Sequence, residues 1–126
     1  MESQQTAEIA ISQVLKDYYF KGIYEGDTSL LNEVYHPGTL LFGDVKGEPY
    51  AKTLTAYLAG VAQRQSPRDS GKPFQGDILA IKVVQSIALA EIKVKMYEFN
   101  YHEFLSFHKI EGRWMIVNKM IADVKP

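Results

Sequence analysis

Residues 23–44, IYEGDTSLLNEVYHPGTLLFGD, interrupt a long helical pattern, form a short second helix and then enter an apolar run. Gly26 suits the left-handed backbone position that ends a helix, and Asp27 is a good cap for the next one. Pro37 stops the second helix because its ring nitrogen has no hydrogen to donate. The stretch therefore predicts a helix, a break, a short helix and a first strand.

The apolar spacing on either side of this stretch extends the prediction. Residues 5–25 repeat apolar side chains every three or four positions, which is typical of one face of a helix. Residues 39–42 are predicted as a short strand and residues 43–49 as a turn. A further helix is expected at 50–65, followed by a loop at 66–76 that is rich in proline and glycine.

From Asp77 onward the apolar spacing changes to every second residue. Four strands are predicted, at residues 77–84, 86–97, 101–110 and 113–124. Their connections are too short for parallel crossovers, so neighbours in the chain should pair antiparallel. Helices followed by such a meander predict an α+β domain. The last two strands are apolar on both faces, which favours a homodimer that covers the face without helices.

Length and composition restrict the class of protein. The 126 residues predict one domain, residues 1–126, and the lack of cysteine excludes disulfides and thiolate chemistry. Fourteen basic and fifteen acidic residues form no block of like charge, which argues against nucleic acid or a membrane surface as partner. Because there is no secretory leader and no apolar run of ~20 residues, we expect a cytoplasmic protein.

The order of the predicted elements resembles the nuclear transport factor 2-like superfamily. Two stretches carry the resemblance: YYFKGIYEGDTSLLNEVYHP at 18–37 and LSFHKIEGRWMIVNK at 105–119. The second is most similar to the branch called SnoaL-like or putative lumazine-binding. The resemblance implies a cystatin-like cone, in which a curved antiparallel sheet wraps a long N-terminal helix around a cavity. It also implies frequent dimers, but no single activity, since members include isomerases, cyclases, dehydratases, carriers and interaction modules.

Metal and cofactor chemistry have little support in the sequence. His102 and His108 fall on one strand face but six residues apart, or ~20 Å, which is too far to share a metal ion. His36 has no second ligand near it in the chain, so we expect no metal site. No nucleotide-binding motif or catalytic serine motif is present, and we expect no cofactor.

Acid–base chemistry is implied by the resemblance. In members similar to ketosteroid isomerase, a tyrosine on the first helix, an aspartate after the first strand and an acid on a late strand face the cavity. Tyr19 falls on the tyrosine position, with Tyr18 one residue away, and Glu103 falls near the late acid. The aspartate position falls at Gly43, so Asp44 fits only if one residue is inserted. The predicted catalytic residues are Asp44, Glu103 and Tyr19.

The cavity that the resemblance implies could hold a ligand. We expect a largely apolar pocket that binds a small organic molecule, aromatic or alicyclic in part. Methionine gives such a pocket an adaptable wall, and a buried asparagine amide needs hydrogen-bond partners that a ligand can supply. The predicted ligand contacts are Tyr18, Tyr57, Met96, Asn118 and Met120.

Each candidate also has an ordinary structural explanation. Tyr18 and Tyr19 can be core aromatic residues whose hydroxyls reach solvent. Asp44 can be a turn residue, and Glu103 can pair with a lysine on a neighbouring strand, such as Lys93. Three functions therefore stay open: a small-molecule-binding protein, an acid–base enzyme acting on a small hydrophobic carbonyl compound, and a dimerisation module without a ligand.

Overall fold

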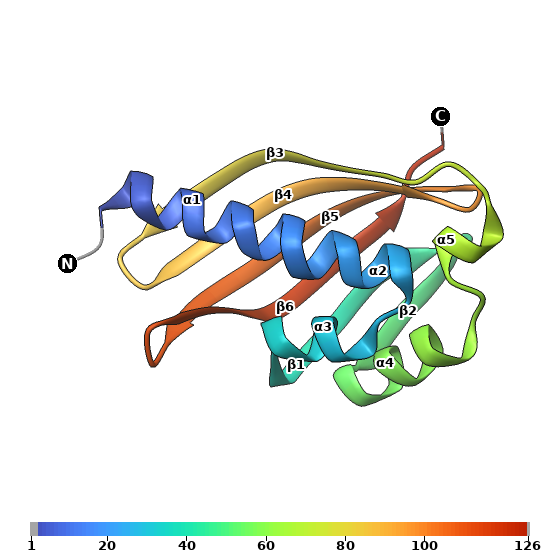
Figure 1. Ribbon diagram of the computed structural model, residues 1–126, viewed down its shortest axis with the longest axis horizontal. Helices are drawn as coiled ribbons and strands as arrows, with labels where there is room; N and C mark the ends of the chain where they lie inside the picture. The colour runs from blue at the N-terminus through green and yellow to red at the C-terminus, as the bar shows by residue number, and fades with distance from the viewer. Residues whose placement is uncertain (1–2, 126) are drawn as a thin grey trace.

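A computed structural model describes residues 3–125, in which a curved six-stranded sheet wraps around an N-terminal helix (Figure 1). The helical elements are α1 (Gln4–Val14), the π-helical segment η1 (Leu15–Phe20), α2 (Lys21–Glu25), α3 (Thr28–Val34), α4 (Leu54–Gln63) and α5 (Pro67–Ser70). The strands are β1 (Tyr35–Val45), β2 (Glu48–Thr53), β3 (Gln75–Val84), β4 (Ile87–Met96), β5 (Phe99–Ile110) and β6 (Arg113–Asp123). The predicted α+β fold is confirmed.

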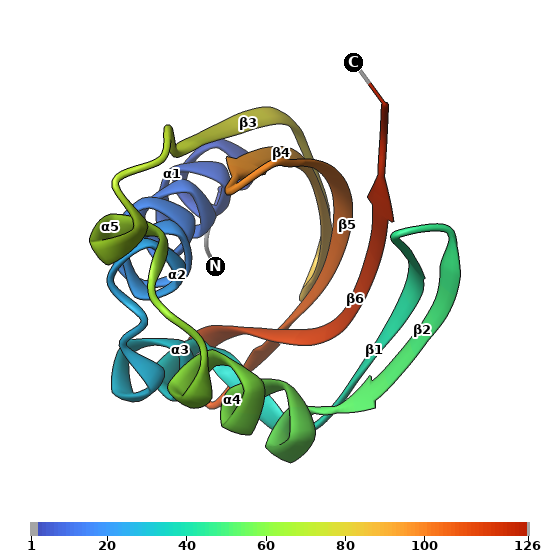
Figure 2. The ribbon, with the colours of Figure 1, turned by 90° about the vertical axis from the view of Figure 1, so that its right-hand side faces the viewer.

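The sheet is open, with strand order β2-β1-β6-β5-β4-β3. Figure 2 shows the strands curving around an interior that α1 and α2 close on one side and α4 closes at the lower edge. The meander from β3 to β6 is antiparallel, as predicted, whereas β1 lies parallel to β6. The short-connection argument did not cover this last pair, because β1 and β6 are far apart in the chain.

The N-terminal helix runs from Gln4 to Glu25 without a gap, and η1 forms a wider turn in its middle. The predicted helix at 5–25 and its break are confirmed. Gly26 ends the helix in the left-handed conformation, with φ of 69°. The side chain of Asp27 then accepts hydrogen bonds from the first backbone N–H groups of α3.

The segment after α3 differs from the prediction. The first strand covers Tyr35–Val45 rather than residues 39–42, and β2 occupies residues expected to be turn and helix. Only Lys46 and Gly47 form the turn between them, with φ of 57° and 76°. Two successive positive φ angles match the twist of a two-residue hairpin, so the chain folds back at once and α4 starts only at Leu54.

One irregularity in the β5–β6 pair decides which side chains enter the interior. Ser106 pairs with Asn118, whereas Phe107 pairs with Ile116, so β6 carries one extra residue, Val117. Such a bulge exchanges the two faces of a strand, because side chains alternate with a period of two. Before the bulge, Ile116 faces the core; beyond it, Lys119 does.

The core lies between the concave face of the sheet and the helices. Its apolar side chains come from every layer: Ile11, Leu15 and Ile23 from the N-terminal helix, Leu31 from α3, and Ile92, Leu105, Phe107 and Ile116 from the sheet. Burial of these side chains stabilises the cone by the hydrophobic effect. Two charged residues, Glu103 and Lys119, are buried beside them.

Candidate functional site

Glu103 on β5 and Lys119 on β6 meet Tyr19 of η1 inside the cone, and we call these three residues the inner cluster. The Tyr19 hydroxyl donates a hydrogen bond to Oε1 of Glu103. The Lys119 Nζ lies 3.7 Å from the same oxygen. Glu103 is 1% exposed and Lys119 3% exposed, so the ion pair is shielded from water. A buried charge needs a partner of opposite charge, and Glu103 and Lys119 are each other's partner.

Aromatic rings surround the ammonium group of the inner cluster. The Lys119 Nζ lies 4.7 Å from the ring centroid of Tyr57 and 5.3 Å from that of Tyr19, within range of cation–π attraction. The ring of Tyr35 packs edge-on against Tyr57, with centroids 5.8 Å apart. Its hydroxyl is buried and has no hydrogen-bond partner of good geometry in the described part of the chain. The cluster therefore combines a fixed charge pair with a close group of tyrosine rings.

The same surroundings set the protonation states. Burial alone lowers the pKa of Lys119, but the adjacent Glu103 carboxylate and Tyr57 outweigh it, and the pKa ends above its ordinary value. Burial, and then the charge of Glu103, hold the pKa of Tyr19 well above its usual range. At neutral pH, Lys119 is an ammonium ion and Tyr19 a neutral hydroxyl.

A cavity of about 220 Å³ opens onto the inner cluster between α4, the β1–β2 hairpin and the sheet. This volume is below the ~300–1,000 Å³ typical of sites for drug-sized ligands, so it suits a smaller molecule. The sequence led us to expect a largely apolar pocket, whereas apolar side chains such as Ile23, Val61 and Met96 form only part of this wall. Its polar side chains are Tyr50, Lys52, Tyr57, Arg64, Tyr101, Glu103 and Lys119.

Four of the residues proposed from the sequence lie at this site. Tyr19 and Glu103 are in contact, Tyr57 covers Lys119, and Met96 lines the cavity. Tyr18 is not among them, because it points away from the core and is 38% exposed. Adjacent residues on a helix point about 100° apart, so only one of the two tyrosines can face the cavity.

The other three proposed residues lie on the outer face of the sheet. Asp44 is exposed, and the Asn118 side chain donates a hydrogen bond to the carbonyl oxygen of Leu40, at 3.3 Å. Met120 is 47% exposed. The bulge at Val117 explains the last two positions, since it turns residues 118 and 120 away from the face that Trp114 and Ile116 occupy. The structure does not bring these three residues to the cavity.

The packing around Gly43 explains why this chain has no aspartate at the position where the isomerases carry one. Its φ is 151°, and a Cβ atom there would lie 1.7 Å from the carbonyl oxygen of Ile121. No side chain fits this position, so a carboxylate at 43 is excluded by the packing of β1 on β6. Glu103 does pair with a lysine on a neighbouring strand, as the ordinary structural explanation expected, but the partner is Lys119 of β6. It is not Lys93, because Glu103 lies opposite Ile92 and Lys93 lies opposite His102.

Sequence reasoning missed two residues of the site, Lys119 and Arg64. If every second residue of the strand is counted, Lys119 lies between the apolar residues Val117 and Ile121. In the same way, Glu103 follows Tyr101 in an alternation that is otherwise apolar or aromatic. Opposite charges in the apolar registers of two paired strands are a signal for a buried ion pair. Arg64 gave no such signal, because a basic residue at the end of a helix is ordinary.

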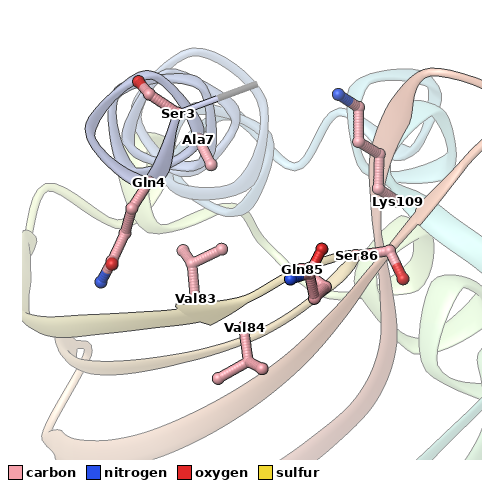
Figure 3. A pocket seen from close by; sticks show the side chains of 8 residues that line it. All are labelled: Ser3, Gln4, Ala7, Val83, Val84, Gln85, Ser86 and Lys109. Atoms are coloured by element: carbon pink, nitrogen blue, oxygen red, sulfur yellow. The ribbon is translucent and has the colours of Figure 1, made fainter. Parts of the chain in front are cut away.

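The remaining hollows carry less chemistry. The largest, about 530 Å³, lies at the opposite end of the molecule between the start of α1, the β3–β4 turn and Lys109 (Figure 3). It holds none of the proposed site residues. Within residues 3–125, no group of three His, Asp or Glu residues could bind a metal ion, and His102 bonds instead to Glu91 at 2.6 Å. No helix in that range is long and apolar enough to cross a membrane.

The curved sheet around a helix, with a cavity at its wider end, defines a nuclear transport factor 2-like protein. Residues 6–121 match the family described as "Putative lumazine-binding", and the chain belongs to that family. A curated relative is the aldolase FrzH of a Cladobotryum species, 26% identical over 102 residues that cover 81% of this chain and 80% of that protein.

Solved structures show the same fold. A nuclear transport factor 2-like protein of unknown function from Shewanella baltica OS155 has a TM-score of 0.86 and 21% identity, with all of both chains covered. One of unknown function from Silicibacter pomeroyi DSS-3 has a TM-score of 0.86 and 19% identity, covering 97% of this chain and 99% of that one. These similarities establish the architecture alone.

Proposed function

We propose that the cavity binds a small carbonyl compound and catalyses proton transfer at the carbon next to the carbonyl group. The observation that carries this proposal is the buried Tyr19–Glu103–Lys119 cluster at the cavity, which joins a carboxylate base to a fixed positive charge. The relative named as an aldolase supports it, since aldol chemistry begins by activating a carbon beside a carbonyl group.

The two charged residues have complementary roles in this proposal. Glu103 takes the proton from carbon; Tyr19 already bonds to its Oε1, and no hydrogen bond within residues 3–125 reaches Oε2. As the proton moves, negative charge develops on the carbonyl oxygen of the substrate. The Lys119 ammonium then stabilises the enolate oxygen electrostatically. Tyr19 keeps the carboxylate in place.

Lys119 acts in this scheme as a cation rather than as a nucleophile. Its pKa is raised by Glu103 against the effect of burial, so its nitrogen keeps its proton and has no lone pair to attack a carbonyl carbon. The intermediate is therefore an enolate and not an imine. Borohydride added with pyruvate should leave the mass of the protein unchanged.

Hydrogen–deuterium exchange tests the proposal directly. Pyruvate and cyclohexanone are incubated with the protein in deuterated water, and loss of the proton signals beside the carbonyl is followed by NMR. The wild type should speed exchange, and Glu103→Gln should slow the catalysed rate by about 10²–10⁴-fold. Glu98→Gln, at an exposed position, is the matched control. Exchange no faster than in buffer, or an unaffected Glu103→Gln variant of native circular dichroism, contradicts the proposal.

We also propose that two copies of the chain pair through the outer face of the sheet. Phe42, Met120 and Phe104 are neighbours across β1, β6 and β5, and they are 42%, 47% and 43% exposed. Leu40 and Leu89 extend this patch and are 45% and 40% exposed. A contiguous apolar patch of this kind marks a protein interface. We call these five residues the outer patch.

The oligomeric state tests the pairing. Sedimentation velocity should show a dimer for the wild type and a monomer for Phe104→Lys, since a lysine in the middle of the interface is buried without a partner. Glu111→Lys, in the exposed β5–β6 turn, is the control for added charge. A wild-type monomer at every concentration, or a Phe104→Lys dimer, contradicts the pairing.

A further inference from the structure

We propose that Arg64 forms an anion subsite in the cavity wall and selects substrates that carry a carboxylate group. The inference rests on the proposed function, because it names the class of carbonyl compound that the cavity accepts: a small oxo acid. Arg64 lines the same cavity as Glu103 and Lys119 but makes no contact with either that would occupy its guanidinium group.

The guanidinium group has an unused donor. Its Nε is buried and has no hydrogen-bond partner among the residues that the structure describes. A buried donor without an acceptor costs free energy, more so on a charged group, and such groups are rare in folded proteins. An oxygen atom of a bound ligand would satisfy it. This orphaned donor distinguishes Arg64 from an ordinary surface arginine.

Two contacts hold Arg64 in position. It is the residue that ends α4, and its backbone N–H bonds to the carbonyl oxygen of Gly60, at 3.1 Å. Its guanidinium carbon lies 5.8 Å from the ring centroid of Tyr97, which the chain anchors through a hydrogen bond from the tyrosine hydroxyl to the Gln65 carbonyl. A cation held beside an anchored aromatic ring is preorganised for binding.

The charge balance of the wall favours an anion. Lys52, Arg64 and Lys119 are its cations and Glu103 its only carboxylate. Lys119 and Glu103 neutralise each other, so two positive charges are left, and neither forms an ion pair within residues 3–125. The carboxylate of Asp123, which lies outside the cavity wall, accepts a hydrogen bond from the backbone N–H of Asn100, at 3.2 Å.

The geometry favours a carboxylate in particular. The guanidinium fork of Arg64 presents paired N–H donors that match the two oxygens of a carboxylate. The cavity of about 220 Å³ has no room for a nucleotide, so the anion must be part of a small molecule. A substrate held by Arg64 at its carboxylate and by Lys119 at its carbonyl oxygen would be fixed at both ends.

A pair of neutral and anionic probes tests the subsite. Benzoate and benzamide have the same shape and differ in charge, and their affinities are measured by NMR titration. The wild type should bind benzoate about tenfold or more tightly than benzamide, since a partly buried charged pair contributes at least that factor. Arg64→Gln should abolish the difference, because it should weaken benzoate binding far more than benzamide binding. Arg64→Lys should restore part of it, because a lysine keeps the charge but not the fork.

Arg68→Gln is the matched control, since Arg68 is 54% exposed on α5 and outside the cavity. Equal affinities for the two probes in the wild type, no binding of benzoate, or a preference that survives Arg64→Gln would each overturn the subsite. The outcome is separable from that of the proposed function. If the protein catalyses proton exchange of cyclohexanone but binds benzoate and benzamide equally, only the anion subsite is contradicted. If it prefers benzoate but catalyses no exchange, only the catalytic proposal is contradicted.

Discussion

Strands β5 and β6 depart from the usual distribution of polarity at one level of the sheet. On the inner face, Glu103 and Lys119 are buried charges. On the outer face, one residue further along each strand, Phe104 and Met120 are exposed apolar side chains. Most antiparallel sheets place apolar residues inside and charges outside. We proposed a partner for each of these two exceptions: a polar ligand inside and a second copy of the chain outside.

The energetics of the inner face support this conclusion. A buried ion pair loses its hydration and often contributes no more stability than apolar residues of similar volume. The inner cluster therefore has no advantage over leucine or methionine for folding alone. Its position beside a cavity that also contains the unpaired Nε donor of Arg64 agrees with the role in ligand chemistry that we propose.

The largest expected effect comes from breaking the inner pair. Glu103→Met leaves the Lys119 ammonium buried without a counterion, and the free energy of unfolding should fall by about 3–5 kcal/mol. Lys119→Met should be equally costly for the opposite reason. The double variant should regain most of the loss, because it removes both charges. Urea unfolding followed by circular dichroism measures all three.

The double variant distinguishes a role of the ion pair in folding from a role in function. A stable double variant without exchange activity would show that the pair is kept for function. If either single variant were as stable as the wild type, the pair would be too weakly coupled to hold a catalytic carboxylate in place.

A smaller effect is expected from alkaline pH. In the unfolded chain, Tyr19 loses its proton near pH ~10 and Lys119 near ~10.4. The folded chain retains both protons to higher pH, because the pKa values of both groups are raised there. It then binds more protons than the unfolded chain, so stability present below pH ~10 is lost as the pH rises further.

The slope of this loss can be assigned to the cluster. Each group contributes up to about 1.4 kcal/mol per pH unit while only the folded form keeps its proton. Urea unfolding of the wild type and Tyr19→Phe at several alkaline pH values should give a shallower slope for the variant. Identical slopes would mean that Tyr19 titrates alike in both states, and the burial argument would fail.

The smallest effect is expected on the outer face. Asp44 is exposed on β1 and lies outside the inner cluster, so Asp44→Asn should change the free energy of unfolding by less than about 0.5 kcal/mol. Urea unfolding measures this change. A large loss of stability would show that the outer face contributes more to the monomer than its exposure indicates.

The fold could be predicted from the sequence more fully than the site. The 3.6-residue and two-residue spacings gave the long helix and the meander, because those elements bury one continuous face. Strand β2 was missed because its residues run into the helical spacing of α4, and the tight turn at Lys46–Gly47 looked like a longer loop.

The site depends on features that spacing does not encode. The resemblance brought out Tyr19 and Glu103, which the structure places in contact. Asn118 and Met120 were assigned to the pocket because strict alternation was assumed through β6, and one extra residue at Val117 reverses it. The same reversal carries Lys119 inward, so a single bulge explains both the misplaced residues and the missed one.

Exchange by two carboxyl variants, one on each face, tests the central claim most directly. Glu103→Gln and Asp44→Asn remove the two carboxylates proposed as bases, the first inside the cone and the second on the outer face. The rate of proton exchange of cyclohexanone in deuterated water is measured for both variants and the wild type. We expect wild-type rates for Asp44→Asn and the loss of catalysis in Glu103→Gln. Loss of catalysis in Asp44→Asn, with full activity in Glu103→Gln, would contradict the account.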